Sequence, residues 1–161
     1  MTTIAYKDGV LAGDSLWSDE RGDVTTLANK VFKLQNGILY GGAGDDDDRA
    51  LLKLLGKVKR PKDFPPISEL RKLRQDLSGL IVFPDGRVFT IDVSAEKDGY
   101  SSVCEIVEKV AAIGRGSIHA LSAMAHGKSA IEAVEFACTM NVFSRPPITH
   151  VELKTTNKRK R

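Results

Sequence analysis

The chain has 161 residues, 42% of them hydrophobic and 28% charged, which is the composition of a single globular domain and excludes a disordered chain. Its two cysteines, Cys104 and Cys138, have no close partner in the sequence, which argues against a disulfide framework or a zinc ribbon. The net charge of +3 includes five basic residues after position 153, so the rest of the chain is slightly acidic and nucleic acid is not an expected partner.

No apolar run is long enough to span a membrane, and the residues after Met1 lack the basic and apolar regions of a signal peptide. We therefore expect a cytoplasmic protein without a membrane anchor. No linker composition interrupts the chain, so we predict a single domain over residues 1–153 and a flexible basic tail over 154–161.

Two hairpins are predicted in the first forty residues, because Asp8-Gly9 and Asn36-Gly37 each separate two apolar runs. These dipeptides favour the tight turns that join antiparallel strands. The tract Gly41–Gly44 then ends the second hairpin in conformations that a side chain would obstruct. The flanking runs are residues 4–6 and 10–12 in the first hairpin, and 31–34 and 38–40 in the second.

Two helices are predicted next, separated by a basic, proline-rich connector over residues 59–66. The four acidic residues Asp45–Asp48 precede the first, leucine-rich helix. They suit its positive end better than a cation site, because no spaced ligand loop follows. The second helix is expected to present one apolar face, consisting of Leu70, Leu73 and Leu77.

Strands and helices follow once more in the second half. A Pro84-Asp85-Gly86 turn predicts a hairpin over residues 80–93, and 110–113 reads as a buried strand. Ser117 is expected to cap a third helix that stops near Gly127. Ser129 and Glu132 form the capping box of a fourth helix, and the last strands are expected at Val142, Phe143 and Val151.

This order of elements predicts an α+β fold in which helices cover both outer sides of two sheets. No phosphate loop or dinucleotide fingerprint occurs, and His119, His126 and His150 lack the spacing of metal ligands. We therefore expect neither a cofactor nor a metal, and any dependence on ATP would come from a partner. Both cysteines are expected to be buried thiols.

The amino terminus carries the strongest chemical signal. Threonine is small enough for the initiator Met1 to be removed, which would leave Thr2 with a free α-amine. Such a residue combines a nucleophilic hydroxyl with a base, because the amine titrates near pH 7.7 to 8.0. Thr2 is thus a candidate nucleophile.

Several short segments extend this signal along almost the whole chain. In their order and separation they resemble the proteasome β-type peptidases, and most of all the HslV type. The resemblance implies a four-layer αββα sandwich of the N-terminal nucleophile hydrolase type and hydrolysis of peptide bonds by an amino-terminal threonine. The segments are Thr2-Thr3-Ile4, Ala12-Gly13-Asp14, Asn29-Lys30-Val31, Gly41–Gly44 and Ala112-Ile113-Gly114.

The resemblance assigns a role to four residues. Thr2 matches the nucleophile, Lys30 the active-site lysine, and Asp14 the acidic residue that orients that lysine. Gly41 matches the glycine whose backbone N–H helps to bind the oxyanion. Each residue also has a plainer interpretation: Asp14 as a turn former, Lys30 as a solvated lysine at a strand edge, and the glycines as a tight turn.

Two positions depart from the family's pattern. Arg115 stands where the family has an auxiliary serine, and Thr139 stands where it has an auxiliary aspartate. The groups that help to move the proton of the amine are therefore altered.

Three functions follow from these residues. The first is a threonine-type endopeptidase that cleaves peptides or unfolded proteins inside a homo-oligomeric, self-compartmentalising ring, with or without an HslU-like ATPase. The second is a catalytically weak or silent ring or scaffold subunit, which Arg115 and Thr139 favour. The third is an amidase for a small substrate, because the same nucleophile serves any acyl transfer.

Overall fold

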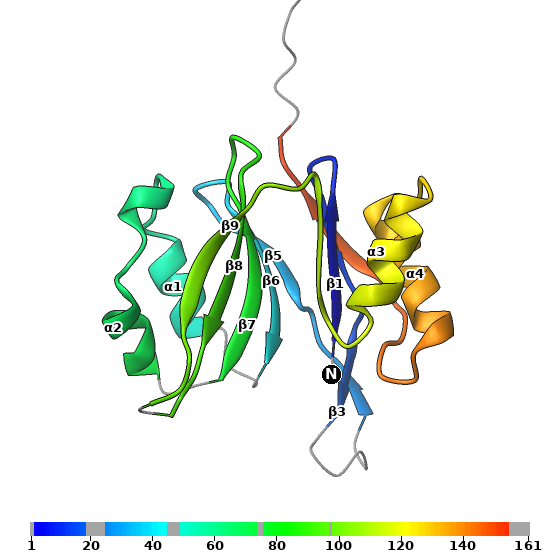
Figure 1. The fold of residues 1–161 in the computed structure, drawn as a ribbon, viewed down its shortest axis with the longest axis horizontal. Coiled ribbons are helices and arrows are strands. Elements are labelled where there is room, and N and C mark those ends of the chain that lie inside the picture. Colours follow the sequence, from blue (N-terminus) through cyan, green and yellow to red (C-terminus); the bar gives the residue numbers. More distant parts are fainter. Residues whose placement is uncertain (1, 19–24, 45–48, 74–75, 97, 155–161) are drawn as a thin grey trace, which may run out of the picture.

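The computed structural model describes residues 2–18, 25–44, 49–73, 76–96 and 98–154. Their strands form a four-stranded and a five-stranded antiparallel sheet and one two-stranded ribbon. Figure 1 shows the two larger sheets side by side, with the amino-terminal strand in the interior of the molecule.

The four-stranded sheet has the order β10-β1-β2-β11, so β1 lies at its centre. The predicted first hairpin is confirmed, because β1 and β2 pair antiparallel around Asp8 and Gly9, which have φ angles of 50° and 84°. The bounds are Thr3–Lys7 for β1, Val10–Gly13 for β2, Val110–Gly114 for β10 and Thr149–Glu152 for β11.

The five-stranded sheet has the sequential order β5-β6-β7-β8-β9. The hairpins predicted at Asn36-Gly37 and at Pro84-Asp85-Gly86 are confirmed as β5–β6 and β7–β8. The ribbon joins β3, Leu16–Ser18, to β4, Thr25–Leu27. The bounds of the five strands are Val31–Lys33, Leu39–Gly44, Leu77–Val82, Val88–Val93 and Ser102–Ile106.

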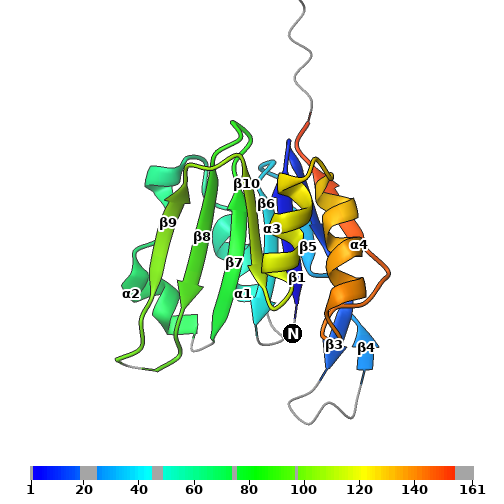
Figure 2. The same cartoon turned by 45° about the vertical axis from the view of Figure 1, so that its right-hand side comes forward.

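The four α-helices of the described residues are short and lie on the two outer sides of the sheets, as Figure 1 and the turned view in Figure 2 show. On the side of the five-stranded sheet, α1 spans Arg49–Leu55 and α2 spans Ile67–Leu70. On the side of the four-stranded sheet, α3 spans Ser117–Ala125 and α4 spans Ala130–Met140. The capping box of α4 is confirmed, because Ser129 Oγ accepts a hydrogen bond from the Glu132 N–H.

Three apolar clusters hold these parts together. One lies between the two sheets and includes Ile4, Leu11 and Leu80. A second packs α1 and α2 against the five-stranded sheet, and a third packs α3 and α4 against the four-stranded sheet. Burial of these side chains supplies most of the stabilising free energy.

The predicted four-layer αββα sandwich of the N-terminal nucleophile hydrolase type is not what the chain forms. The described residues form a small β-rich domain of mostly antiparallel sheets with four short helices. The helices cover the sheets only in part: α2 has 4 residues and passes into a 3-10 turn, and on β9 both Cys104 and Glu105 are exposed. The proline-rich connector is one cause, because it leaves only a 3-10 turn at Pro61–Asp63 between α1 and α2.

Four local predictions are also wrong. Leu77 belongs to β7 and does not share a helix with Leu70, because it pairs with Val93 in the sheet. Ser117 is the first residue of α3, and Gly116 is its N-cap. Val142 and Phe143 form no strand. The Gly41–Gly44 tract continues β6 instead of ending the meander.

Two predictions concern residues outside the described ranges: the acidic helix start at Asp45–Asp48 and the flexible tail from residue 155. No helix in the described part of the chain is both long and apolar enough to cross a membrane.

Candidate functional site

The amino-terminal strand is enclosed from both sides. β1 pairs with β10 on one side and with β2 on the other, and Thr3 lies opposite Gly114. Thr2 is 6% exposed and Thr3 is fully buried. Polar side chains at such positions need hydrogen-bonding partners, because burying them without any is costly.

The fully buried carboxylate of Asp14 is the centre of these contacts. Its Oδ1 accepts hydrogen bonds from the Thr3 N–H at 2.8 Å and from Lys30 Nζ at 3.1 Å. Its Oδ2 accepts from the Leu16 N–H at 3.0 Å and from the Arg145 N–H at 3.2 Å. Four donors from separate segments therefore offset the cost of burying this charge.

Lys30 is also buried, with 7% of its side chain exposed. Its Nζ donates to the Leu16 carbonyl oxygen as well as to Asp14. Burial lowers the pKa of Lys30 from its usual value of 10.5, and the charge of Asp14 opposes that shift. The interpretation of Lys30 as a solvated lysine at a strand edge is therefore wrong.

Asp14 connects this ammonium group to the chain beside Thr2. A single oxygen, Oδ1, accepts from both Lys30 Nζ and the Thr3 N–H, so Lys30 lies two hydrogen bonds from the Thr2–Thr3 peptide. The structure thus places Asp14 and Lys30 together, one residue from the candidate nucleophile.

A second polar contact lies on the other side of the same strand. Thr3 Oγ1 and the fully buried Ser144 Oγ are 2.6 Å apart. A Cβ atom built on Gly116 would lie 2.1 Å from Thr3 Oγ1, so only glycine fits there without a shift. No local pattern pointed to Ser144 or to the backbone of Arg145, because both reach the site through contacts across more than a hundred residues.

Gly41 lies in β6, and an added Cβ atom would stand 2.7 Å from Ile4 in the core between the sheets. The N–H of Gly42 donates to the Lys30 carbonyl oxygen at 3.0 Å. Successive N–H groups of a strand point to opposite edges, so the N–H of Gly41 is directed toward β7, where Leu80 is its partner in register. Its role at an oxyanion stays a prediction from the resemblance.

The two departures from the family pattern occupy different places. Arg115 is exposed, and its Cζ lies 5.7 Å from the ring centroid of Phe143. Thr139 is exposed, and its Oγ1 donates to the Phe136 carbonyl oxygen of its own helix at 2.7 Å. Thr139 is thus engaged with α4, whereas Arg115 lies directly after Gly114, the residue opposite Thr3.

The expectation that both cysteines are buried is wrong for Cys104, which is exposed on β9. Cys138 is half-buried on α4, and burial raises the pKa of its thiol to about 11. Within the described ranges, no three His, Cys, Asp or Glu side chains converge to hold a metal ion.

A cavity of about 440 Å³ lies at the far end of β1 from Thr2. Tyr6 and Asp8 line it, together with the ends of β8 and β9. It is therefore separate from the polar contacts around Asp14.

Comparisons with known proteins bear on the fold alone. No protein-family model matches the sequence, and no curated protein matches it. A solved structure described as Thiobacillus denitrificans BPH is similar to this chain, with 21% sequence identity and a TM-score of 0.60. The match covers 96% of this chain and 98% of that chain, so the two share their overall fold.

Proposed function

We propose that this chain, once Met1 is removed, hydrolyses peptide bonds with Thr2 as its nucleophile. The observation that supports the proposal best is the buried Asp14–Lys30 pair, because the same carboxylate also holds the backbone of Thr3. A buried lysine with a lowered pKa and a fixed carboxylate partner is costly to maintain, and such groups concentrate at catalytic sites.

In the proposed reaction, Thr2 Oγ1 attacks the carbonyl carbon of the scissile bond while the α-amine of Thr2 accepts the hydroxyl proton. The C–N bond then breaks, and the leaving amine takes that proton. A water molecule hydrolyses the resulting ester and restores the hydroxyl. The amine suits this role because it titrates near neutral pH, at about 7.7 to 8.0.

Lys30 and Asp14 would assist without bonding to the substrate. The positive charge of Lys30 favours the alkoxide form of Thr2, and Asp14 keeps that charge in place. Asp14 also holds the beginning of β1 in place, because its Oδ1 accepts a hydrogen bond from the Thr3 N–H. Loss of either residue should therefore impair the same step.

We extend the proposal to the assembly, on the resemblance alone. Peptides or unfolded proteins would be the substrates, and a homo-oligomeric ring, with or without an HslU-like ATPase, would enclose the sites. Light scattering tests this extension, because a single subunit of 17.5 kDa at micromolar concentration would contradict the ring.

The catalytic proposal is tested with a peptide carrying a threonine-directed electrophile, followed by intact-mass measurement. We expect one adduct on a chain that begins at Thr2, and none on Thr2→Ala. Lys30→Met should slow labelling about a hundredfold or more, because it removes the charge that stabilises the alkoxide. The matched control is Lys33→Met, because Lys33 lies three residues further along, at the end of β5, where it is exposed and donates to the Glu152 carbonyl oxygen.

Two results would contradict the proposal. One is peptide hydrolysis by a chain that retains Met1, since its amine would then be blocked. The other is equal labelling of Lys30→Met and Lys33→Met.

A second candidate function is a weak or silent subunit of a ring or scaffold. It is favoured by the positions of Arg115, which stacks on Phe143, and Thr139, which bonds within its helix. Arginine has neither a hydroxyl nor a carboxylate, and the Thr139 hydroxyl is engaged with the Phe136 carbonyl oxygen. Absence of any adduct on a chain that begins at Thr2 would support this alternative.

A further inference from the structure

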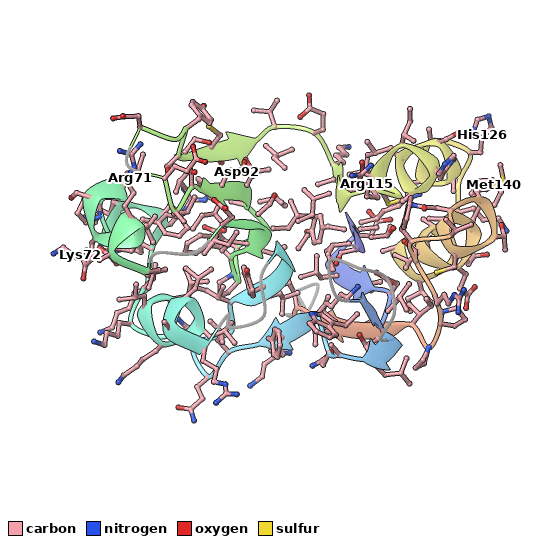
Figure 3. The ribbon with its side chains drawn as sticks, turned by 90° about the horizontal axis from the view of Figure 1, so that it is seen from below. Arg71, Lys72, Asp92, Arg115, His126 and Met140 are labelled. Carbon is pink, nitrogen blue, oxygen red and sulfur yellow. The ribbon has the colours of Figure 1, made fainter. Side chains whose placement is uncertain are left out.

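Arg115 directly follows the residue that packs against the carbonyl group of the proposed nucleophile. Gly114 is opposite Thr3, and a Cβ atom built on Gly114 would be 2.0 Å from the Thr2 carbonyl oxygen. The next residue in the chain is Arg115. In Figure 3 it lies at the start of α3, next to the central strands of the four-stranded sheet.

Phe143 reaches the same place from the other end of the sequence. Its neighbour Ser144 contacts Thr3, and the following Arg145 N–H donates to Asp14. Arg115 and Phe143 therefore flank the beginning of β1. The guanidinium stands over the Phe143 ring at 5.7 Å, a geometry that stabilises a cation and limits the motion of its side chain.

Among the described residues, no carboxylate lies within ion-pair distance of Arg115. Other arginines differ: Arg87 contacts Asp85 at 2.7 Å, and Arg60 contacts Asp63 at 3.5 Å. Arg115 is thus an exposed, positioned cation whose N–H donors are available. A planar guanidinium of this kind suits a carboxylate, which it can bind through two parallel hydrogen bonds.

We propose that Arg115 determines specificity by binding a carboxylate of the substrate close to the scissile bond. This inference rests on the proposed function of Thr2. The substrate class is a peptide or amide with an acidic group next to the bond that is cleaved. Phe143 acts as a positioning residue, because it holds the guanidinium and does not itself contact the carboxylate.

The test compares two peptide electrophiles that differ only in Glu or Gln beside the reactive carbonyl. Wild type should label Thr2 about three- to tenfold faster with the Glu compound, since an exposed charge pair contributes modestly. Added salt should reduce that ratio. Arg115→Gln should bring it to one, Phe143→Leu should lower it, and Arg87→Gln should leave it unchanged.

The two proposals fail in different ways. If neither compound labels Thr2 in the wild type, the proposed function is wrong. If both label it at equal rates, or if Arg115→Gln keeps the preference for Glu, the function stands and the role of Arg115 is wrong.

A third compound, a small electrophile with the same reactive carbonyl and a terminal carboxylate as its only charge, identifies the source of the acidic group. Faster labelling by this compound than by the Glu peptide, lost in Arg115→Gln, supports the role of Arg115 and assigns the carboxylate to a small substrate. Faster labelling by the Glu peptide assigns it to an acidic side chain.

Discussion

The two helix–sheet interfaces of this molecule are built from side chains of very different size. Beneath α1 and α2 the buried side chains are large, and they include Leu51, Leu55, Leu70, Phe83 and Phe89. Beneath α3 and α4 most of them are alanines, namely Ala5, Ala12, Ala120, Ala123, Ala130, Ala133 and Ala137.

This difference matters because the distance between packed elements depends on the side chains between them. An added Cβ on Gly116 would stand 3.2 Å from the Ala137 Cβ and 2.1 Å from Thr3 Oγ1. The alanine interface thus brings α4 and the loop after it close enough for Ser144 to reach Thr3. The large-residue interface supplies buried apolar area away from these contacts, so the two interfaces can be disturbed separately.

The largest effect is expected from Phe83→Ala in the large-residue interface. Phe83 is 1% exposed and makes edge-to-face contacts with Phe64 and Phe89 at 5.4 and 5.5 Å. Its removal leaves a cavity and should lower the free energy of unfolding by about 3–5 kcal/mol. Urea unfolding measures the loss, while the rate of Thr2 labelling per folded molecule should not change. A slower rate would show that the two interfaces are coupled.

A larger side chain in the alanine interface should cost less stability than Phe83→Ala but should slow the labelling of Thr2. Ala137→Leu adds volume next to Gly116, so we expect a loss of about 1–3 kcal/mol together with slower labelling of Thr2. Ala125→Leu is the control, because Ala125 is exposed on α3. If both variants label at the wild-type rate, close packing of α4 is not needed for the site.

Removing a single hydroxyl group near each interface tests whether only the alanine interface affects the labelling of Thr2. Ser144→Ala leaves the buried Thr3 hydroxyl without this partner and should cost about 1 kcal/mol, again with slower labelling. Ser101→Ala is its counterpart near the five-stranded sheet, where Ser101 Oγ accepts from the Ser94 N–H at 3.1 Å. Labelling should stay at the wild-type rate in that variant, and a slower rate would contradict the separation of the interfaces.

The smallest effect on stability is expected in the last comparison, which concerns only the chemical reactivity of the two cysteines. At pH 8 iodoacetamide should modify the exposed Cys104 well before Cys138, as peptide mapping would show. The pKa of Cys138 is raised from 9.0 to about 11, so its thiolate fraction at pH 8 should be roughly a hundredfold smaller than at the usual value. Equal rates for the two thiols would show that α4 opens readily from the sheet.

The sequence by itself determined the features that depend on a few neighbouring residues. The turns at Asp8-Gly9, Asn36-Gly37 and Pro84-Asp85-Gly86 and the capping box at Ser129 are confirmed, since each is set by local backbone preferences and hydrogen bonds. One prediction made from local spacing is wrong. The spacing of Leu70, Leu73 and Leu77 fits a helix, but Leu77 gains a strand partner in Val93, which the spacing does not encode.

In the candidate site, too, some features follow from the sequence and others only from the tertiary structure. The order of short segments in the sequence was enough to select Thr2, Asp14 and Lys30 as one set. Only the tertiary structure decided that Asp14 binds Lys30 and the Thr3 N–H together, that Ser144 meets Thr3, and that Arg115 stacks on Phe143. These contacts join segments far apart in the chain, and their geometry depends on how closely the alanine interface packs, which no local pattern records.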